Sequence, residues 1–192
     1  MTQLDRAKSD LKQEAKALWL MARGLNERFD AAVALLGGAS GRVVVTGMGK
    51  NGHIGAKIAA TMASTGTPAF FLHPGEALHG DLGMLTPDDA LLAMSNSGGN
   101  FEVLRVVEFA KGYGIPVVSM SANAASNLAK MSDVALTIPA LPEACPLNMA
   151  PTTSTTVMLA LGDALALALM RNKTFSAADF VRLHPAGALG RK

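Results

Sequence analysis

The apolar residues divide the chain into two parts with different spacing. From Leu11 to Leu36 the apolar positions alternate steps of four and three residues. This spacing is typical of a helix that lies nearly parallel to another helix. A glycine-rich segment at 37–41 ends the pattern. We therefore predict a long N-terminal helix over residues 1–37, packed either on its own domain or on a partner.

After Gly41, short and nearly continuous apolar runs alternate with helical segments. Strands buried on both faces have this appearance, and intervening helices indicate a parallel sheet with right-handed crossovers. The sequence predicts an α/β protein, a three-layer αβα sandwich with a five-stranded parallel sheet, in a single domain: an N-terminal helix at 1–37, then the α/β core and C-terminal tail at 41–192. The expected strands are 43–46, 69–72, 90–94, 116–120 and 134–138, and the expected helices 52–64, 100–113, 125–131 and 153–171.

The composition of the chain argues against a nucleic-acid partner and against a membrane-spanning segment. The chain has 17 basic and 15 acidic residues and only 5% aromatics, so a nucleic-acid partner is not expected. The most apolar run, 157–170, is too short to span a membrane, and a helix that is apolar on most sides must be buried in the core or between subunits. We therefore expect a homo-oligomer without a membrane partner. The single cysteine, Cys145, and an N-terminus that does not resemble a secretory signal favour the cytoplasm.

The first candidate site follows the first expected strand, where Thr46 leads into a glycine loop. Gly47, Gly49 and Gly52 lack the side chains that would block an anion from the backbone N–H groups. The following helix directs the positive end of its dipole at the same place, and Lys50 adds a mobile charge. The sequence predicts a phosphate-binding loop here.

Two nucleotide-binding motifs compete for this loop. The spacing Gly-x-Gly-x-x-Gly matches a dinucleotide fingerprint, which also needs an acidic residue about 20 residues further on. The next expected strand instead ends in His73-Pro74. The spacing of the ATP-binding P-loop is absent as well. Both nucleotide interpretations are therefore disfavoured.

A second polar loop follows the third expected strand. Ser95, Asn96 and Ser97 precede two glycines and open a helix, which makes another anion-binding nest. Ordinary helix capping is the alternative explanation. Because loops after parallel strands meet at one edge of the sheet, we expect both loops to share one phosphate-ester site.

Acid–base candidates lie on other loops. Glu102 falls in the first turn of the helix after the serine loop. There its carboxylate either complements the helix dipole or acts as a base near the sugar end of a ligand. His73 and His79 suit proton transfer or hydroxyl binding better than a metal site, because a Pro-Gly pair separates them. Cys145 is expected to be a small packed residue rather than a nucleophile.

Taken together, these segments resemble the sugar isomerase (SIS) domain family, and within it the D-arabinose-5-phosphate isomerases. The motifs that carry the resemblance are Gly-Met-Gly-Lys at 47–50, Ser-Thr-Gly-Thr-Pro at 64–68, His-Pro at 73–74, His-Gly-Asp-Leu-Gly-Met at 79–84, Ser-Asn-Ser-Gly at 95–98, Glu-Ala-Cys-Pro-Leu at 143–147 and His-Pro-Ala-Gly-Ala-Leu-Gly-Arg at 184–191.

The resemblance implies an aldose–ketose isomerase that interconverts D-ribulose 5-phosphate and D-arabinose 5-phosphate through an enediol. This reaction is the first step towards Kdo in lipopolysaccharide or capsule synthesis, and it demands no cofactor. The resemblance also implies a tetramer with active sites shared between subunits. Another phosphosugar isomerase and a non-catalytic SIS module that senses sugar phosphates are the alternatives.

The resemblance assigns roles by position. It implies that zinc can bind at His73 without being required, and it implies no nucleotide-type regulation, because the chain stops at Lys192 where the family usually continues into a pair of CBS domains. The implied catalytic residues are Lys50, Glu102, Glu143 and His184, and the expected substrate-binding residues are Thr46, Gly47, Gly49, Gly66, Thr67, His73, His79, Ser95, Asn96 and Ser97.

Overall fold

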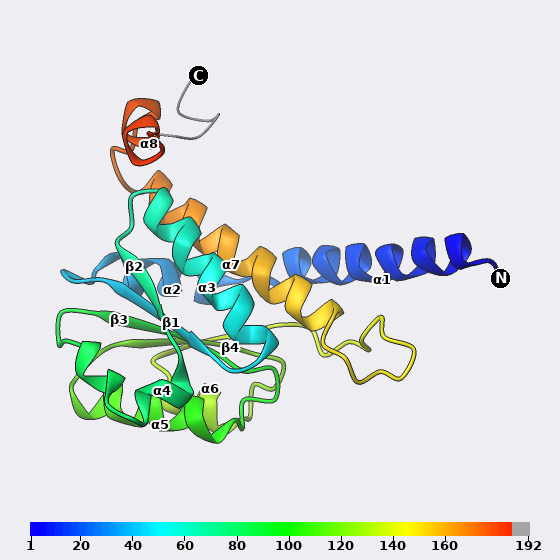
Figure 1. The fold of residues 1–192 in the computed structure, drawn as a ribbon, viewed down its shortest axis with the longest axis horizontal. Coiled ribbons are helices and arrows are strands. Elements are labelled where there is room, and N and C mark those ends of the chain that lie inside the picture. Colours follow the sequence, from blue (N-terminus) through cyan, green and yellow to red (C-terminus); the bar gives the residue numbers. More distant parts are fainter. Residues whose placement is uncertain (186–192) are drawn as a thin grey trace.

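The computed structural model describes residues 1–185, and a five-stranded parallel sheet lies at its centre (Figure 1). The strand order is β2-β1-β3-β4-β5, so β1 pairs with both β2 and β3. The chain places β2 on one side of β1 and β3 on the other. In parallel sheets a crevice forms at such a point, here at the carboxyl ends of β1 and β3. The strands are β1 (Val43–Gly47), β2 (Ala69–Leu72), β3 (Ala90–Met94), β4 (Val117–Ser121) and β5 (Val134–Thr137).

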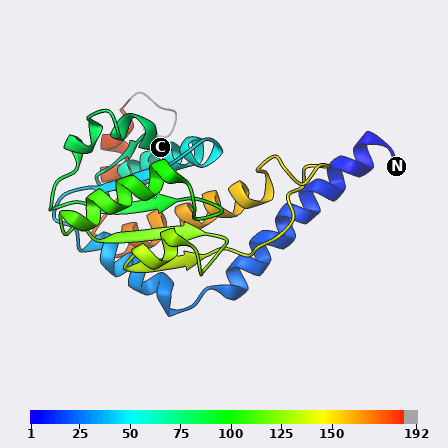
Figure 2. The same ribbon diagram turned by 90° about the horizontal axis from the view of Figure 1, so that it is seen from below.

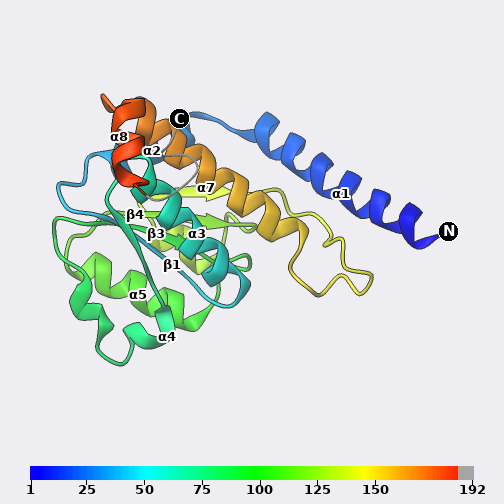
Figure 3. The ribbon, with the colours of Figure 1, turned by 45° about the horizontal axis from the view of Figure 1, so that its top comes forward.

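Helices cover both faces of the sheet, which confirms the predicted three-layer sandwich. Alternate residues of β1 separate the two cores, with Val43 and Val45 in one and Val44 in the other. Figures 1 and 3 show α3 and α7 together on one face and α4 and α5 on the opposite face. The helices after β1 are α3 (Lys50–Ser64), α4 (Pro74–Ala77), the 3-10 helix η1 (Asp81–Met84), α5 (Phe101–Gly112), α6 (Asn127–Met131), α7 (Thr153–Arg171) and α8 (Ala177–Leu183).

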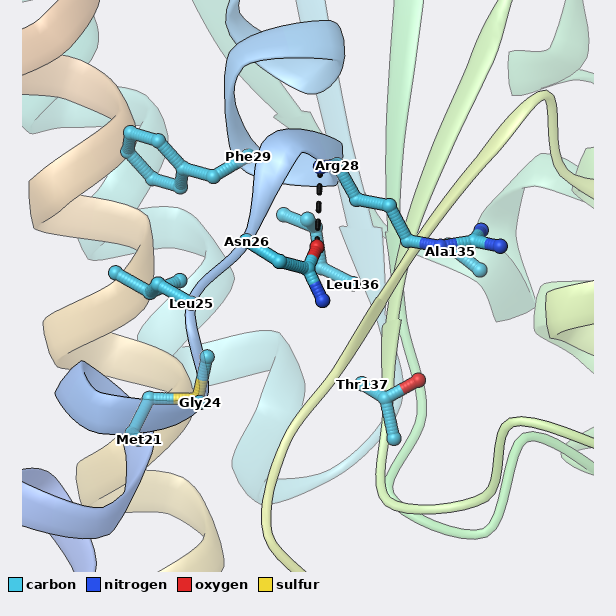
Figure 4. Close-up of a pocket in the computed structure, with 9 residues that line it drawn as sticks. All are labelled: Met21, Gly24, Leu25, Asn26, Arg28, Phe29, Ala135, Leu136 and Thr137. Atoms are coloured by element: carbon cyan, nitrogen blue, oxygen red, sulfur yellow. Dashed lines mark hydrogen bonds between the residues drawn. The ribbon is translucent and has the colours of Figure 1, made fainter.

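The long N-terminal helix is confirmed, but its continuity to residue 36 is not. Two helices, α1 (Gln3–Gly24) and α2 (Glu27–Gly37), are separated by two residues with extended backbone, Leu25 and Asn26. The Asn26 side chain accepts a hydrogen bond from the backbone N–H of Arg28 at 3.0 Å and so caps the second helix (Figure 4). The break lets α2 pack on the sheet while α1 extends away from the domain (Figure 2).

The apolar helix α7 belongs to the core. By length and composition it could cross a membrane, but half of it is buried inside the domain, where it packs against α3 and α1. The two helices α7 and α3 approach each other closely at Gly162, which lies directly against Ile58. A helix that is apolar on most sides is expected to be buried in this way.

This close approach gives a stability test. In Gly162→Ala the added methyl group would overlap the Ile58 side chain, so we expect a loss of about 1–3 kcal/mol in the free energy of unfolding, measured with urea. Gly112→Ala is the matched control, because a methyl group at Gly112 meets nothing within 4 Å. Equal stability of the two variants would contradict the packing described here.

Candidate functional site

Two loops at the carboxyl ends of neighbouring strands line one cleft. The pairing of β1 with β3 places Gly47 beside Met94, so the loops that follow these residues emerge together. The cleft has a volume of about 300 Å³. The predicted meeting of the glycine loop and the serine loop is therefore present in the structure. The residues that line the cleft are Met48, Asn51, Met94, Ser95, Asn96, Ser97 and Asn100.

The glycine loop is shaped by close backbone contacts. A Cβ atom on Gly47 would lie 3.1 Å from the Asn51 carbonyl oxygen, and one on Gly52 would lie 2.8 Å from the Gly47 carbonyl oxygen. Gly49 has a positive φ of 61° and is the N-cap of α3, with no side-chain cap. Lys50 begins the helix and is exposed to solvent. The positive end of α3 therefore lies at the glycine loop beside the cleft, and Lys50 is exposed next to Asn51, which lines the cleft.

The polar side chains of the serine loop differ in burial and in hydrogen bonding. Ser95 is buried, and its hydroxyl accepts a hydrogen bond from the N–H of Gly98 at 3.2 Å. Asn96 and Ser97 are exposed on the lining of the cleft. Asn100 caps α5 by accepting from the N–H of Val103 at 2.9 Å. Ser95 thus fixes the loop, whereas Asn96 and Ser97 present groups that can bind a ligand.

Thr46 does not fit the substrate-contacting role expected for it. Its side chain is fully buried in β1, and its hydroxyl donates a hydrogen bond to the Leu72 carbonyl oxygen at 2.8 Å. This bond joins β1 to the end of β2. The Thr46 side chain therefore serves the sheet rather than the cleft.

His73 lies beside the glycine loop. It is exposed at the start of α4, and Gly75 next to it packs against both the His73 ring and Met48. His79 is exposed just after α4, and Glu102 is partly exposed in the first turn of α5. Within residues 1–185, no three His, Cys, Asp or Glu residues are grouped so that they could hold a metal ion. Zinc binding at His73 stays a prediction.

Glu143 is bound at the start of α7. Its Oε2 accepts hydrogen bonds from the N–H and hydroxyl of Thr152 at 2.8 and 3.2 Å and from the N–H of Ser154 at 3.1 Å, while Oε1 accepts from the Ser154 hydroxyl. Burial raises the pKa of Glu143, but these hydrogen bonds outweigh it and lower the pKa overall. The carboxylate is therefore ionised near neutral pH, so it can accept a proton there and donate that proton again.

Three of the expected site residues lie at the opposite edge of the sheet. Gly66 and Thr67 precede β2, and their carbonyl and hydroxyl oxygens accept hydrogen bonds from Lys173 at 3.0 and 2.9 Å. His184 follows α8 and stacks on Phe180. In Figures 1 and 3, α8 lies beyond the end of α3 that is distant from Lys50. A single chain therefore does not bring these residues to the cleft.

Two features escaped the sequence analysis. Lys173 follows α7 in no recognisable motif, yet it holds the 66–67 turn, and burial lowers its pKa. Cys145 was expected to be packed but is partly exposed in the loop before α7. Backbone N–H groups, that of Met149 foremost and then those of Ala150 and Leu147, lower the pKa of its thiol. A curled loop of this kind leaves no periodic signal in a sequence.

Comparisons with known proteins agree on one family. The family model described as the SIS domain matches residues 38–168. Arabinose 5-phosphate isomerase KdsD of Pseudomonas aeruginosa is 56% identical over 173 residues, which cover 90% of this chain and 53% of that protein. KdsD of Yersinia pestis is 52% identical over 185 residues, which cover 96% of this chain and 56% of that protein. The chain thus spans about half the length of these relatives.

A solved structure is similar over its whole length. The Escherichia coli CFT073 protein c3406, in complex with arabinose 5-phosphate, superposes with a TM-score of 0.92 at 41% identity. The match covers 96% of this chain and all of that chain. The likeness therefore includes the sheet, both helical layers and the loops that form the cleft.

The serine loop offers a sharp test of the site. Gly98 has a positive φ of 66°, and a Cβ atom on it would overlap the Ser126 side chain, so Gly98→Ala should displace the loop. We expect the free energy of unfolding to fall by about 1–3 kcal/mol and the affinity for sugar phosphate to fall with it, measured by urea denaturation and calorimetry. Gly99→Ala is the control, since its nearest contact is 3.9 Å away. Unchanged affinity in Gly98→Ala would contradict a binding role for this loop.

Proposed function

The chain belongs to the SIS domain family, and on that premise we propose that it is an aldose–ketose isomerase that interconverts D-ribulose 5-phosphate and D-arabinose 5-phosphate. The cleft between the glycine loop and the serine loop carries this proposal, because it offers two anion-binding loops to one phosphate ester. Relatives about half identical to this chain bear the name arabinose 5-phosphate isomerase KdsD, and a protein 41% identical to it is bound to arabinose 5-phosphate. The product would lead towards Kdo.

The proposed reaction moves one proton between neighbouring carbons. A base removes the proton next to the carbonyl group, the electron pair moves onto the carbonyl oxygen, and the resulting enediol takes a proton at the other carbon. Glu143 suits the base, since its carboxylate is ionised and its Oε1 receives a hydrogen bond from only one residue, Ser154. Lys50 or His79 stabilises the charge on the oxygen, and Glu102 or His184 carries the remaining protons.

A shared site follows from the positions of the candidate residues. Gly66, Thr67 and His184 lie at the edge of the sheet opposite the cleft, so they can reach a bound substrate only from a second copy of the chain. We include in the proposal a homo-oligomer, a tetramer by family resemblance, whose sites combine the cleft of one subunit with the α8 region of another. A cytoplasmic location completes it, in keeping with the single cysteine of the chain.

The substrate is tested with a panel of pentose and hexose phosphates. We expect the purified chain to convert D-ribulose 5-phosphate, and Lys50→Met to lower kcat/KM by at least about 100-fold through loss of the charge at the cleft. Lys57→Met is the control, because Lys57 lies further along α3 and pairs with Asp163 at 2.6 Å. Turnover of a hexulose phosphate alone would identify another isomerase, and binding without turnover would identify a sensor.

Subunit mixing tests the shared site. Lys50→Met and His184→Ala should each be nearly inactive alone, because every site in either protein lacks one group. After the two are unfolded and refolded together, about a quarter of the sites should contain both native residues and regain activity. If the mixture stays as inactive as its parents, the two residues do not come from different subunits.

A further inference from the structure

The loop between β5 and α7, residues 138–152, and the first turn of α7 each receive one hydrogen bond from a distant helix, α1. Gln13 of α1 donates a hydrogen bond from Nε2 to the Pro142 carbonyl oxygen at 2.8 Å. The next residue, Glu14, accepts a hydrogen bond at Oε2 from the Thr156 hydroxyl, in the first turn of α7, at 3.2 Å. Figure 2 shows this loop running beside α1. Two adjacent side chains of α1 therefore bind the loop directly before Glu143 and the first turn of the helix that follows the loop.

We propose that Gln13 and Glu14 are positioning residues for the isomerase, acting through Glu143. This inference rests on the proposed function, because it takes Glu143 as the base. Pro142 directly precedes Glu143, and Thr156 lies one turn beyond Thr152, which binds the Glu143 carboxylate together with Ser154. The two contacts from α1 thus flank the carboxylate along the chain.

Hydrogen bonds inside the loop fix its shape and join it to the start of α7. The Glu143 N–H donates to Asn148 Oδ1 at 2.7 Å, and the Ala144 N–H donates to the hydroxyls of Thr152 and Thr153 at 2.9 and 3.0 Å. All of these bonds join residues of the loop or of the first turn of α7 to one another. The two bonds from α1 connect this unit to a separate element.

The surface between α1 and the loop is grooved beside the Gln13 hydrogen bond. A groove of about 450 Å³ separates the two, and Leu141 and Pro142 line one of its walls. Where apolar contact is incomplete, a single hydrogen bond determines more of the local geometry. The Gln13 amide is therefore a direct polar connection between α1 and the residue that precedes Glu143.

Gln13→Glu tests the proposal with little change of shape. Glutamate keeps the length and helix propensity of glutamine but has no N–H group to donate, and its charge repels the Pro142 carbonyl oxygen. We expect kcat to fall about three- to tenfold with KM nearly unchanged. Gln13→Lys retains a donor and should restore turnover. Gln3→Glu, in the exposed first turn of α1, is the matched control.

The reactivity of the Cys145 thiol reports the geometry of the loop independently of catalysis. It is the single cysteine of the chain and lies in this loop, where backbone N–H groups stabilise its thiolate. The pH dependence of its reaction with a small disulfide reagent therefore reports the shape of the loop. In Gln13→Glu the midpoint of this profile should move to higher pH as the N–H groups move away, and in Gln3→Glu it should not.

Glu14, the neighbour of Gln13, provides a second pair of variants that differ in the hydrogen-bond acceptor. Glu14→Ala removes the acceptor for Thr156 and should lower kcat, whereas Glu14→Gln retains an oxygen acceptor and should not. If kcat and the Cys145 profile are unchanged in both Gln13→Glu and Glu14→Ala, the proposal is overturned. A shifted profile with unchanged kcat overturns it as well. If the native chain turns over no sugar phosphate, the proposed function fails, while the Cys145 profile still decides whether α1 holds the loop.

Discussion

The parallel pairing of β1 with β3 is the constraint on which the site depends. Both strands are buried throughout, and the register places Gly47 against Met94, so the glycine loop and the serine loop leave the sheet side by side. A shift of this register by one residue would turn the apolar side chains of a strand to the wrong faces and would separate the loops. The same apolar packing that stabilises the sheet therefore determines the width of the cleft.

Much of the fold could be predicted from the sequence, because the signals are periodic or local. Apolar runs as long as strands indicated all five strands, and glycines before Lys50 indicated a close backbone turn. The break at Leu25 and Asn26 was missed because the apolar spacing continues across it. An apolar pattern records which face of a helix is buried, but it does not record whether the helix is continuous.

The site was only partly predictable, because side-chain direction depends on partners far away in the chain. Thr46 and Glu143 have the right chemistry for a ligand, yet one donates to the Leu72 carbonyl and the other binds the start of α7. Motif resemblance placed Gly66 and His184 with the substrate, although in one chain they lie at the other edge of the sheet. Motifs record which residues a family shares and not where the fold of one chain places them.

The extended position of α1 has a practical consequence. Of its 22 residues only Ala17 and Met21 are buried, and its first turn lies far from the sheet while Gln13 touches the loop beside Glu143 (Figures 1 and 2). An affinity tag or a fusion partner attached before Met1 would be connected through α1 to the loop that carries Glu143. Preparations that differ only in such an extension should not be assumed to have the same turnover, and the tag is best removed before rates are compared.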